Sequence, residues 1–172
     1  MADDLNRIES FRFMVKLFIA SNSPTVIGNS SPAHAKVLLE EMFNAARKTA
    51  FVYCGCISEK VWGGDAIANA VRGALEREVD VRFIVQHADQ IPPDSAIFKL
   101  MQQHGGIVTS PRFAEINSHF AVFDGKMYRF EKNDEAKTAD ACMNDPEWCA
   151  KLEEVARAMV SVAAREDQDA GV

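Results

Sequence analysis

A chain of 172 residues, nearly half of them apolar, is long enough to fold as one domain with a substantial hydrophobic core. Its formal net charge of −6 gives no broad attraction to phosphate backbones, so nucleic acid is a possible but not a favoured partner. No stretch approaches the roughly 18–20 consecutive apolar residues that cross a bilayer. The first residues are acidic, whereas a secretory signal begins with basic ones. We therefore expect a cytoplasmic protein with no membrane segment.

The cysteines and glycines point to no cofactor. Cys54, Cys56, Cys142 and Cys149 lack metal-site spacings such as Cys-x2-Cys, so we expect free thiols and no metal. No glycine-rich phosphate loop is present either. The two tryptophans, Trp62 and Trp148, are expected to anchor the core or an interface.

The N-terminal 32 residues are predicted to form an amphipathic helix followed by a loop. Seven apolar residues recur with helical spacing in Leu5–Ala20: Leu5, Ile8, Phe11, Met14, Val15, Phe18 and Ile19. Residues 21–32 are rich in Ser, Asn and Pro and predict a loop. A main domain over residues 33–166 and a flexible tail over residues 167–172 complete the expected division.

Strands and helices alternate through the middle of the chain. Ser31-Pro32 starts a helix, Asp65 is the expected N-cap of another, and Asp145-Pro146 starts a last helix that ends near Arg165. The remaining predicted elements are strands at 51–56, 81–86 and 107–109 and helices at 66–78 and 96–104. Such an order produces parallel β-α-β units. The fold class expected is α/β, a mixed β-sheet sandwiched by helices.

A β-hairpin near the C-terminus holds the most informative residues. Phe120–Phe123 and Met127–Phe130 predict two strands joined at Asp124-Gly125, a dipeptide that favours a tight turn. Just before the first strand lies the polar triplet Asn117-Ser118-His119, which a purely structural strand does not require.

This hairpin resembles the active-site hairpin of the phospholipase D superfamily, whose motif is His-x-Lys-x4-Asp. With Asp124-Gly125 as the anchor, Asn117 matches the histidine of the motif and His119 matches the lysine. The Gly-Ser-x-Asn stretch of many members falls on residues 131–134, Glu-Lys-Asn-Asp. A helix leading into Val79-Asp80-Val81-Arg82 also resembles the family layout, so the resemblance covers about residues 34–165.

The resemblance implies a phospholipase D-like fold with a degenerate motif. Because asparagine cannot form a phosphohistidine, the family's covalent route is lost at Asn117. Family enzymes combine two motif copies, so a chain with one copy is expected to form a homodimer. The apolar stripe of Leu5–Ala20 is the expected additional contact.

Several side chains are candidates for the site. His119 and Asp124 are the catalytic candidates, since Asp124 could orient the histidine, although aspartate in an Asp-Gly turn is also common for structural reasons. Asn117, His119, Glu131 and Asn133 are the expected binding residues for an anionic, phosphate-containing ligand. Arg129 and Glu131, two residues apart on one strand face, are expected to form a surface ion pair.

Three functions remain open from the sequence. The first is a catalytically degenerate domain that acts as a binding, regulatory or assembly module. The second is a phosphodiesterase or nuclease that uses His119 as its nucleophile in a dimeric site. The third is a structural subunit that has no ligand.

Overall fold

The computed structural model describes residues 2–109, 118–133 and 138–169, and within these ranges it forms one α/β layer structure. The helices are α1 (Ala2–Ala20), α2 (Pro32–Ala45), α3 (Glu59–Trp62), α4 (Asp65–Glu76), α5 (Ala96–Gln103) and α6 (Pro146–Asp169). The strands are β1 (Ile27–Asn29), β2 (Thr49–Cys54), β3 (Asp80–Val85), β4 (Ile107–Thr109), β5 (Phe120–Phe123), β6 (Met127–Asn133) and β7 (Thr138–Cys142). A 3₁₀ turn, η1, covers Ala88–Gln90.

The strands form a single seven-stranded sheet in the order β1-β7-β6-β5-β2-β3-β4. β2, β3 and β4 run parallel to one another, and every other pair is antiparallel. The β5–β6 hairpin therefore lies in the middle of the sheet, where β5 pairs with β2. The expected mixed sheet between helices is confirmed.

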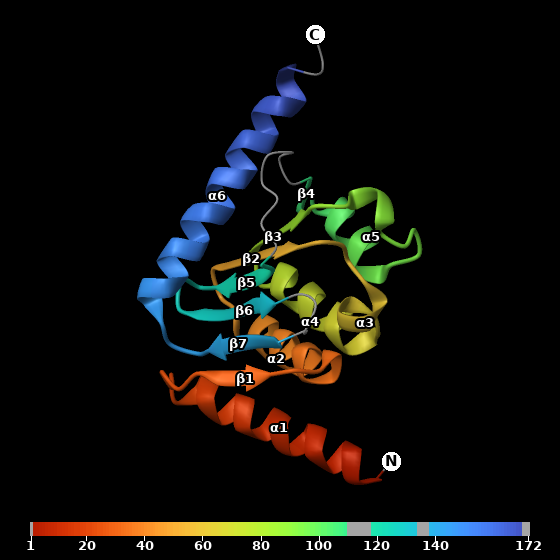
Figure 1. Ribbon diagram of the computed structural model, residues 1–172. Coiled ribbons are helices and arrows are strands. Elements are labelled where there is room, and N and C mark those ends of the chain that lie inside the picture. Colours follow the sequence, from red (N-terminus) through yellow and green to blue (C-terminus); the bar gives the residue numbers. More distant parts are fainter. Residues whose placement is uncertain (1, 110–117, 134–137, 170–172) are drawn as a thin grey trace.

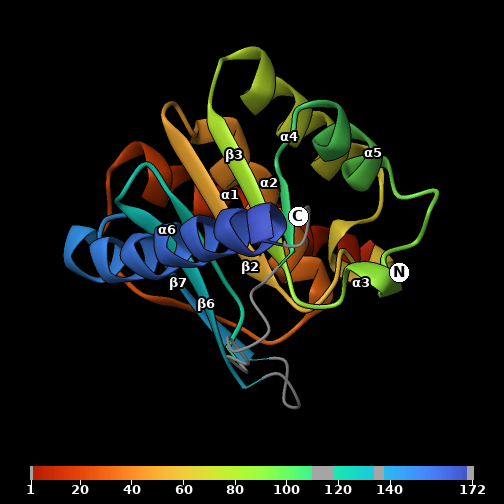
Figure 2. The ribbon, with the colours of Figure 1, turned by 90° about the horizontal axis from the view of Figure 1, so that it is seen from above.

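The two faces of the sheet are covered unequally. Figure 1 shows α2, α3, α4 and α5 on one face and α6 alone on the other, with α1 along the β1 edge. In the view from above, α6 crosses the strands obliquely (Figure 2). The larger apolar cluster lies beneath α2 and α4 around Phe43 and Phe83, and the smaller one lies beneath α6 around Tyr53 and Val122.

Local sequence signals explain the helix starts. The side chain of Ser31 caps α2 by accepting from the amide of His34 at 3.2 Å, and Pro32 follows at the first helical position. Ser95 caps α5 in the same way, accepting from the amide of Phe98 at 3.3 Å. At α4 the expectation was wrong by one residue, because Gly64 holds the N-cap position and Asp65 is already helical.

The apolar stripe of α1 packs against α2 and the larger cluster. Val15 is fully buried, and five of the other predicted stripe residues pack beside it: Ile8, Phe11, Met14, Phe18 and Ile19. Leu5, by contrast, is 65% exposed. Arg12 fixes the same interface with hydrogen-bond distances from its Nη1 of 2.6 Å to Glu41 and 2.9 Å to Glu40. Burial lowers the pKa of Arg12, but these two carboxylates outweigh that effect, so its pKa lies above the ordinary value.

Four parts of the sequence prediction need correction. The loop expected over residues 21–32 contains β1, which pairs with β7, a strand that the sequence analysis did not predict. The short helix α3 was not predicted either. β2 ends at Cys54, so Cys56 is not part of the strand. α6 continues to Asp169, past the helix end that the sequence predicted near Arg165.

Candidate functional site

Asp124 organises the end of the hairpin that is remote from His119. Asp124 and Gly125 both have positive φ, 52° and 64°, as a tight Asp-Gly turn requires. The carboxylate of Asp124 accepts from three successive backbone amides, those of Arg47, Lys48 and Thr49, at 2.7 to 3.1 Å. It thus fastens the turn to the start of β2.

The same geometry separates Asp124 from His119. The two residues flank the four-residue strand β5, and at ~3.3 Å per residue their Cα atoms lie roughly 16 Å apart. The structure therefore does not bring these two catalytic candidates together. Asp124 acts on the backbone of residues 47–49 and does not orient the imidazole.

His119 instead meets Glu131, which lies opposite it across the β5–β6 pair. The amide of Glu131 donates to the carbonyl of His119 at 2.8 Å, which continues the antiparallel ladder by one residue. Their side chains also meet, with His119 Nδ1 at 3.3 Å from Glu131 Oε2. Two of the predicted binding residues therefore share one site.

The imidazole is enclosed by neighbouring strands. A Cβ atom added at Gly55 would lie 3.2 Å from His119 Nε2, so only glycine leaves the ring its present room. Tyr53 contacts the ring edge to face, with centroids 6.4 Å apart. The side chain of His119 remains 20% exposed, the most of the polar groups at this site.

Arg129 and Glu131 form a buried pair, which corrects the expectation of a surface ion pair. Each residue is 8% exposed, and Arg129 Nη1 lies 3.8 Å from Glu131 Oε2. The pair has room beneath the surface because its neighbours on the adjacent strands are small. Ala121 and Ala141 flank Arg129, and Ala139 faces Glu131. Burial lowers the pKa of Arg129, and the carboxylate of Glu131 opposes this only in part.

His119, Arg129 and Glu131 form a row of polar side chains on one face of the sheet, called the polar row below. Asn29 extends this row to the edge of the sheet. It pairs with Ala139, which in turn pairs with Glu131, so Asn29 and Glu131 lie on one face two strands apart. Asn29 is 5% exposed, and neither its Oδ1 nor its Nδ2 has a hydrogen-bond partner among the described residues. The same holds for Nε of Arg129. Each such group costs about 1–3 kcal/mol when buried, so a polar ligand that satisfied them would be favoured.

The sequence analysis missed Asn29 and the burial of Arg129. A signal for Asn29 was present, since Val26-Ile27 followed by a helix start at Ser31 is compatible with a short strand. Of the other predicted binding residues, Asn117 lies outside the described residues. Asn133 ends β6 opposite Thr138, and its backbone alone is described.

Other kinds of site find no support in the described ranges. No group of three His, Cys, Asp or Glu side chains among residues 2–109, 118–133 and 138–169 is arranged to hold a metal ion. None of the described helices is long and apolar enough to span a bilayer.

Comparison with known proteins places this geometry in a familiar fold. No protein-family model and no curated protein sequence matches the chain. The structure of Nuc, a phospholipase D family member from Salmonella typhimurium, is similar with a TM-score of 0.57 and 17% identity over 78% of this chain and 93% of Nuc. NucT from Helicobacter pylori is similar with a TM-score of 0.56 and 13% identity over 80% of this chain and 97% of NucT.

An archaeal chromatin protein has the same architecture. TrmBL2, whose structure shows a novel mode of DNA binding, has a TM-score of 0.59 and 10% identity. The match covers 91% of this chain and 61% of TrmBL2. At these identities the similarity establishes the fold. The chain has a phospholipase D-like fold.

Proposed function

We propose that this chain is a catalytically inactive phospholipase D-like domain, a binding module that holds a phosphate-type anion beside His119. One observation carries the proposal. The buried Nε of Arg129, on the same face as its strand neighbour Glu131, has no partner among the described residues. An anion that accepts from this donor would remove that cost.

The motif positions argue against hydrolysis. Asn117 matches the nucleophile of the family motif and has no group that can form a covalent phosphoryl intermediate. His119 matches the lysine, and its Nδ1 contacts the carboxylate of Glu131. Arg129, the cation of the polar row, is buried against the same carboxylate. Little positive charge therefore remains to stabilise a phosphoryl transition state.

The direction of the charge effects gives a test. Glu131 repels an anion and competes for both His119 and Arg129, so Glu131→Gln should strengthen phosphate binding. Arg129→Gln should weaken it by on the order of tenfold, because a hydrogen bond to a charged group contributes about 1.5–3 kcal/mol. Arg82→Gln is the matched control, since it removes the same charge from an exposed ion pair with Asp80 on β3.

The measurement is a titration with inorganic phosphate followed by the ring resonances of His119. Hydrolysis of bis(p-nitrophenyl) phosphate is assayed on the same samples, and no turnover above the blank is expected. Ring resonances that do not respond to phosphate in the wild type and in Glu131→Gln would refute the binding role.

A second function has its own supporting observation. A histidine whose Nδ1 contacts a carboxylate is arranged like an oriented general base or nucleophile, as His119 and Glu131 are. The alternative is therefore a phosphodiesterase with His119 as nucleophile. Turnover that disappears in His119→Ala and falls in Glu131→Gln would establish it in place of the binding module.

A further inference from the structure

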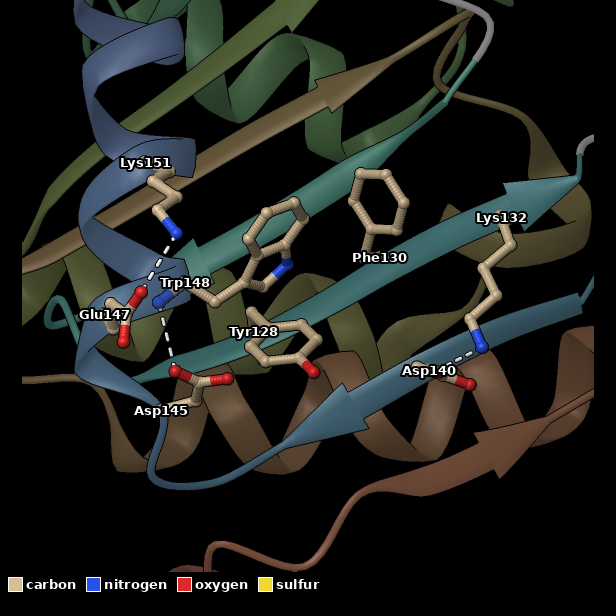
Figure 3. A pocket seen from close by; sticks show the side chains of 8 residues that line it. All are labelled: Tyr128, Phe130, Lys132, Asp140, Asp145, Glu147, Trp148 and Lys151. Carbon is tan, nitrogen blue, oxygen red and sulfur yellow. Dashed lines mark hydrogen bonds and ion pairs between the residues drawn. The ribbon is translucent and has the colours of Figure 1, made fainter.

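An open cavity of about 420 Å³ lies on the face of the sheet that α6 covers. It is bounded by β6, β7 and the first turns of α6 (Figure 3). Because side chains alternate along β6, Tyr128 and Phe130 point into this cavity, whereas Arg129 and Glu131 lie on the opposite face. The cavity is therefore separate from the polar row at His119.

Three aromatic side chains form the walls. Phe130 and Trp148 meet edge to face, with centroids 5.6 Å apart and an interplanar angle of 78°, so they make a corner. Tyr128 continues the wall along β6 (Figure 3). The position of Trp148 is fixed by the helix start, because Asp145 caps α6 by accepting from the amide of Trp148 at 3.0 Å.

The charged groups at the rim leave the cavity negative. Three carboxylates, those of Asp140, Asp145 and Glu147, face two ammonium groups, a net charge of −1. Lys132 contacts Asp140 at 2.5 Å and Lys151 contacts Glu147 at 3.0 Å, so both lysines are neutralised locally.

Two further observations agree with a negative field. Burial raises the pKa of Tyr128 to about 12, and the neighbouring Cys142, Asp145 and Asp140 add to the rise. Lys151 places its Nζ 5.9 Å from the ring centroid of Trp148, so this ring already attracts a cation from its own chain. This negative field would repel a phosphate group.

We propose that this cavity binds a small organic cation with a methylated ammonium group, held against Trp148 and Phe130 and balanced by the carboxylates at the rim. Methylated ammonium groups suit such a site because they are weakly hydrated and attracted to aromatic faces. The size agrees as well, since small-molecule sites range from about 300 to 1,000 Å³.

The test uses tetramethylammonium as the probe and tert-butanol as a neutral probe of similar shape. The readout is the indole Nε1–H resonance of Trp148. Trp62 provides an internal control, because it is buried on the other face against Phe43 and Phe83. We expect tetramethylammonium to shift the Trp148 resonance with saturation in the millimolar range and to leave that of Trp62 unmoved. tert-Butanol should bind at least about threefold more weakly.

Two variants test the charge sign. Lys151→Gln removes the resident cation from Trp148 and should strengthen tetramethylammonium binding by about threefold to tenfold. Phe130→Leu keeps an apolar side chain but removes one ring, and should weaken binding by a similar factor. Lys99→Gln, an exposed site on α5, is the control for the change in net charge.

Two results would overturn the proposal. Equal shifts with tert-butanol and tetramethylammonium would mean that the corner accepts any apolar group. Weaker binding in Lys151→Gln would mean that the ammonium of Lys151 does not compete with the probe for Trp148, and that charge does not drive binding in this cavity. Both measurements use the intact chain, and unchanged Trp62 resonances verify that each variant is folded.

Discussion

The carboxylate of Asp124 accepts a 2.7 Å hydrogen bond from the backbone amide of Lys48, which joins the β5–β6 turn to the start of β2. The carboxylate of Asp124 is thereby engaged at the end of β5 that is remote from His119. Its negative charge is shared among three amides in succession, those of residues 47–49. The aspartate can therefore be required for folding in a chain whose chemistry it does not serve.

Asp124→Asn is expected to destabilise the fold by about 1–2 kcal/mol. Asparagine tolerates the positive φ of the turn, so backbone strain stays similar, but it loses the charge and offers one acceptor oxygen in place of two. Urea unfolding measures the change. His119 ring resonances should stay in place in the variant, and a large shift there would show that Asp124 acts on the site after all.

Gly55→Ala should disturb His119 at little cost in stability. The new Cβ would lie 3.2 Å from Nε2 and 3.4 Å from Cε1 of the imidazole, so the ring must shift slightly, which changes its contact with Glu131. Gly28→Ala on β1 is the matched control, because nothing lies within 4 Å of its added Cβ. We expect phosphate binding to fall several-fold in Gly55→Ala and to be unchanged in Gly28→Ala. Equal effects in both would remove His119 from the site.

Local patterns explain what the sequence could predict. The stripe of α1, the Ser31-Pro32 start of α2 and the Asp124-Gly125 turn each depend on neighbours within a few residues. The sequence did not predict β1, because a strand of three residues shows no periodicity. It did not predict β7, because Thr-Ala-Asp-Ala-Cys has a single β-branched residue. β1 joins the sheet by pairing with β7 across more than 100 residues, and β7 lies between β1 and β6.

The same reasoning applies to the site. The contact between His119 and Glu131 follows from hairpin register, which the turn fixes, so both residues could be selected from the sequence. The burial of Arg129 depends on alanines of β5 and β7, and the place of Asn29 depends on β1 joining the sheet. Neither relationship is visible before the strand order is known.

Asn29→Leu separates stability from function. The variant replaces a buried amide that has no partner among the described residues by an apolar group of similar shape, which should stabilise the fold by about 1 kcal/mol. Phosphate binding should be unchanged, because Asn29 on β1 and His119 beside β5 are separated by β7 and β6. A rise in the urea midpoint together with an unchanged phosphate affinity is the expected result. Lower stability would show that the amide of Asn29 supports the fold, and a lower affinity would extend the anion site to β1.

The stability of the protein should fall at alkaline pH. Burial raises the pKa of the Cys149 thiol from about 9 to about 12, and it raises the pKa of Cys54 as well. Above pH 9 the unfolded chain therefore loses thiol protons that the folded chain keeps, so unfolding becomes progressively easier up to about pH 12. Cys149→Ala should reduce this slope. Urea midpoints at pH 8 and pH 10.5 measure it, and identical slopes in variant and wild type would contradict the assignment.

Homodimer formation remains a prediction. The structure places the apolar surface available for it on a different face of α1 from the predicted stripe. The predicted stripe of α1 is largely buried against α2, except for Leu5, which is 65% exposed. Two apolar side chains outside the stripe also face solvent, Phe13 at 65% and Leu17 at 51%. Phe13 and Leu17 are four residues apart, so they lie on one face of the helix. Because α1 runs along the β1 edge (Figure 1), a partner can reach this face without disturbing the sheet.

Phe13→Asp should therefore convert a dimer into a monomer. A charge placed in an apolar contact is left without a partner, and its desolvation opposes association. Val155→Asp on α6 is the matched control, since it adds the same charge at an apolar residue that is 38% exposed. Light scattering at micromolar concentration gives the mass of each variant. A monomeric wild type would contradict the dimer, and a dimer that is lost in Val155→Asp but kept in Phe13→Asp would place the interface on α6.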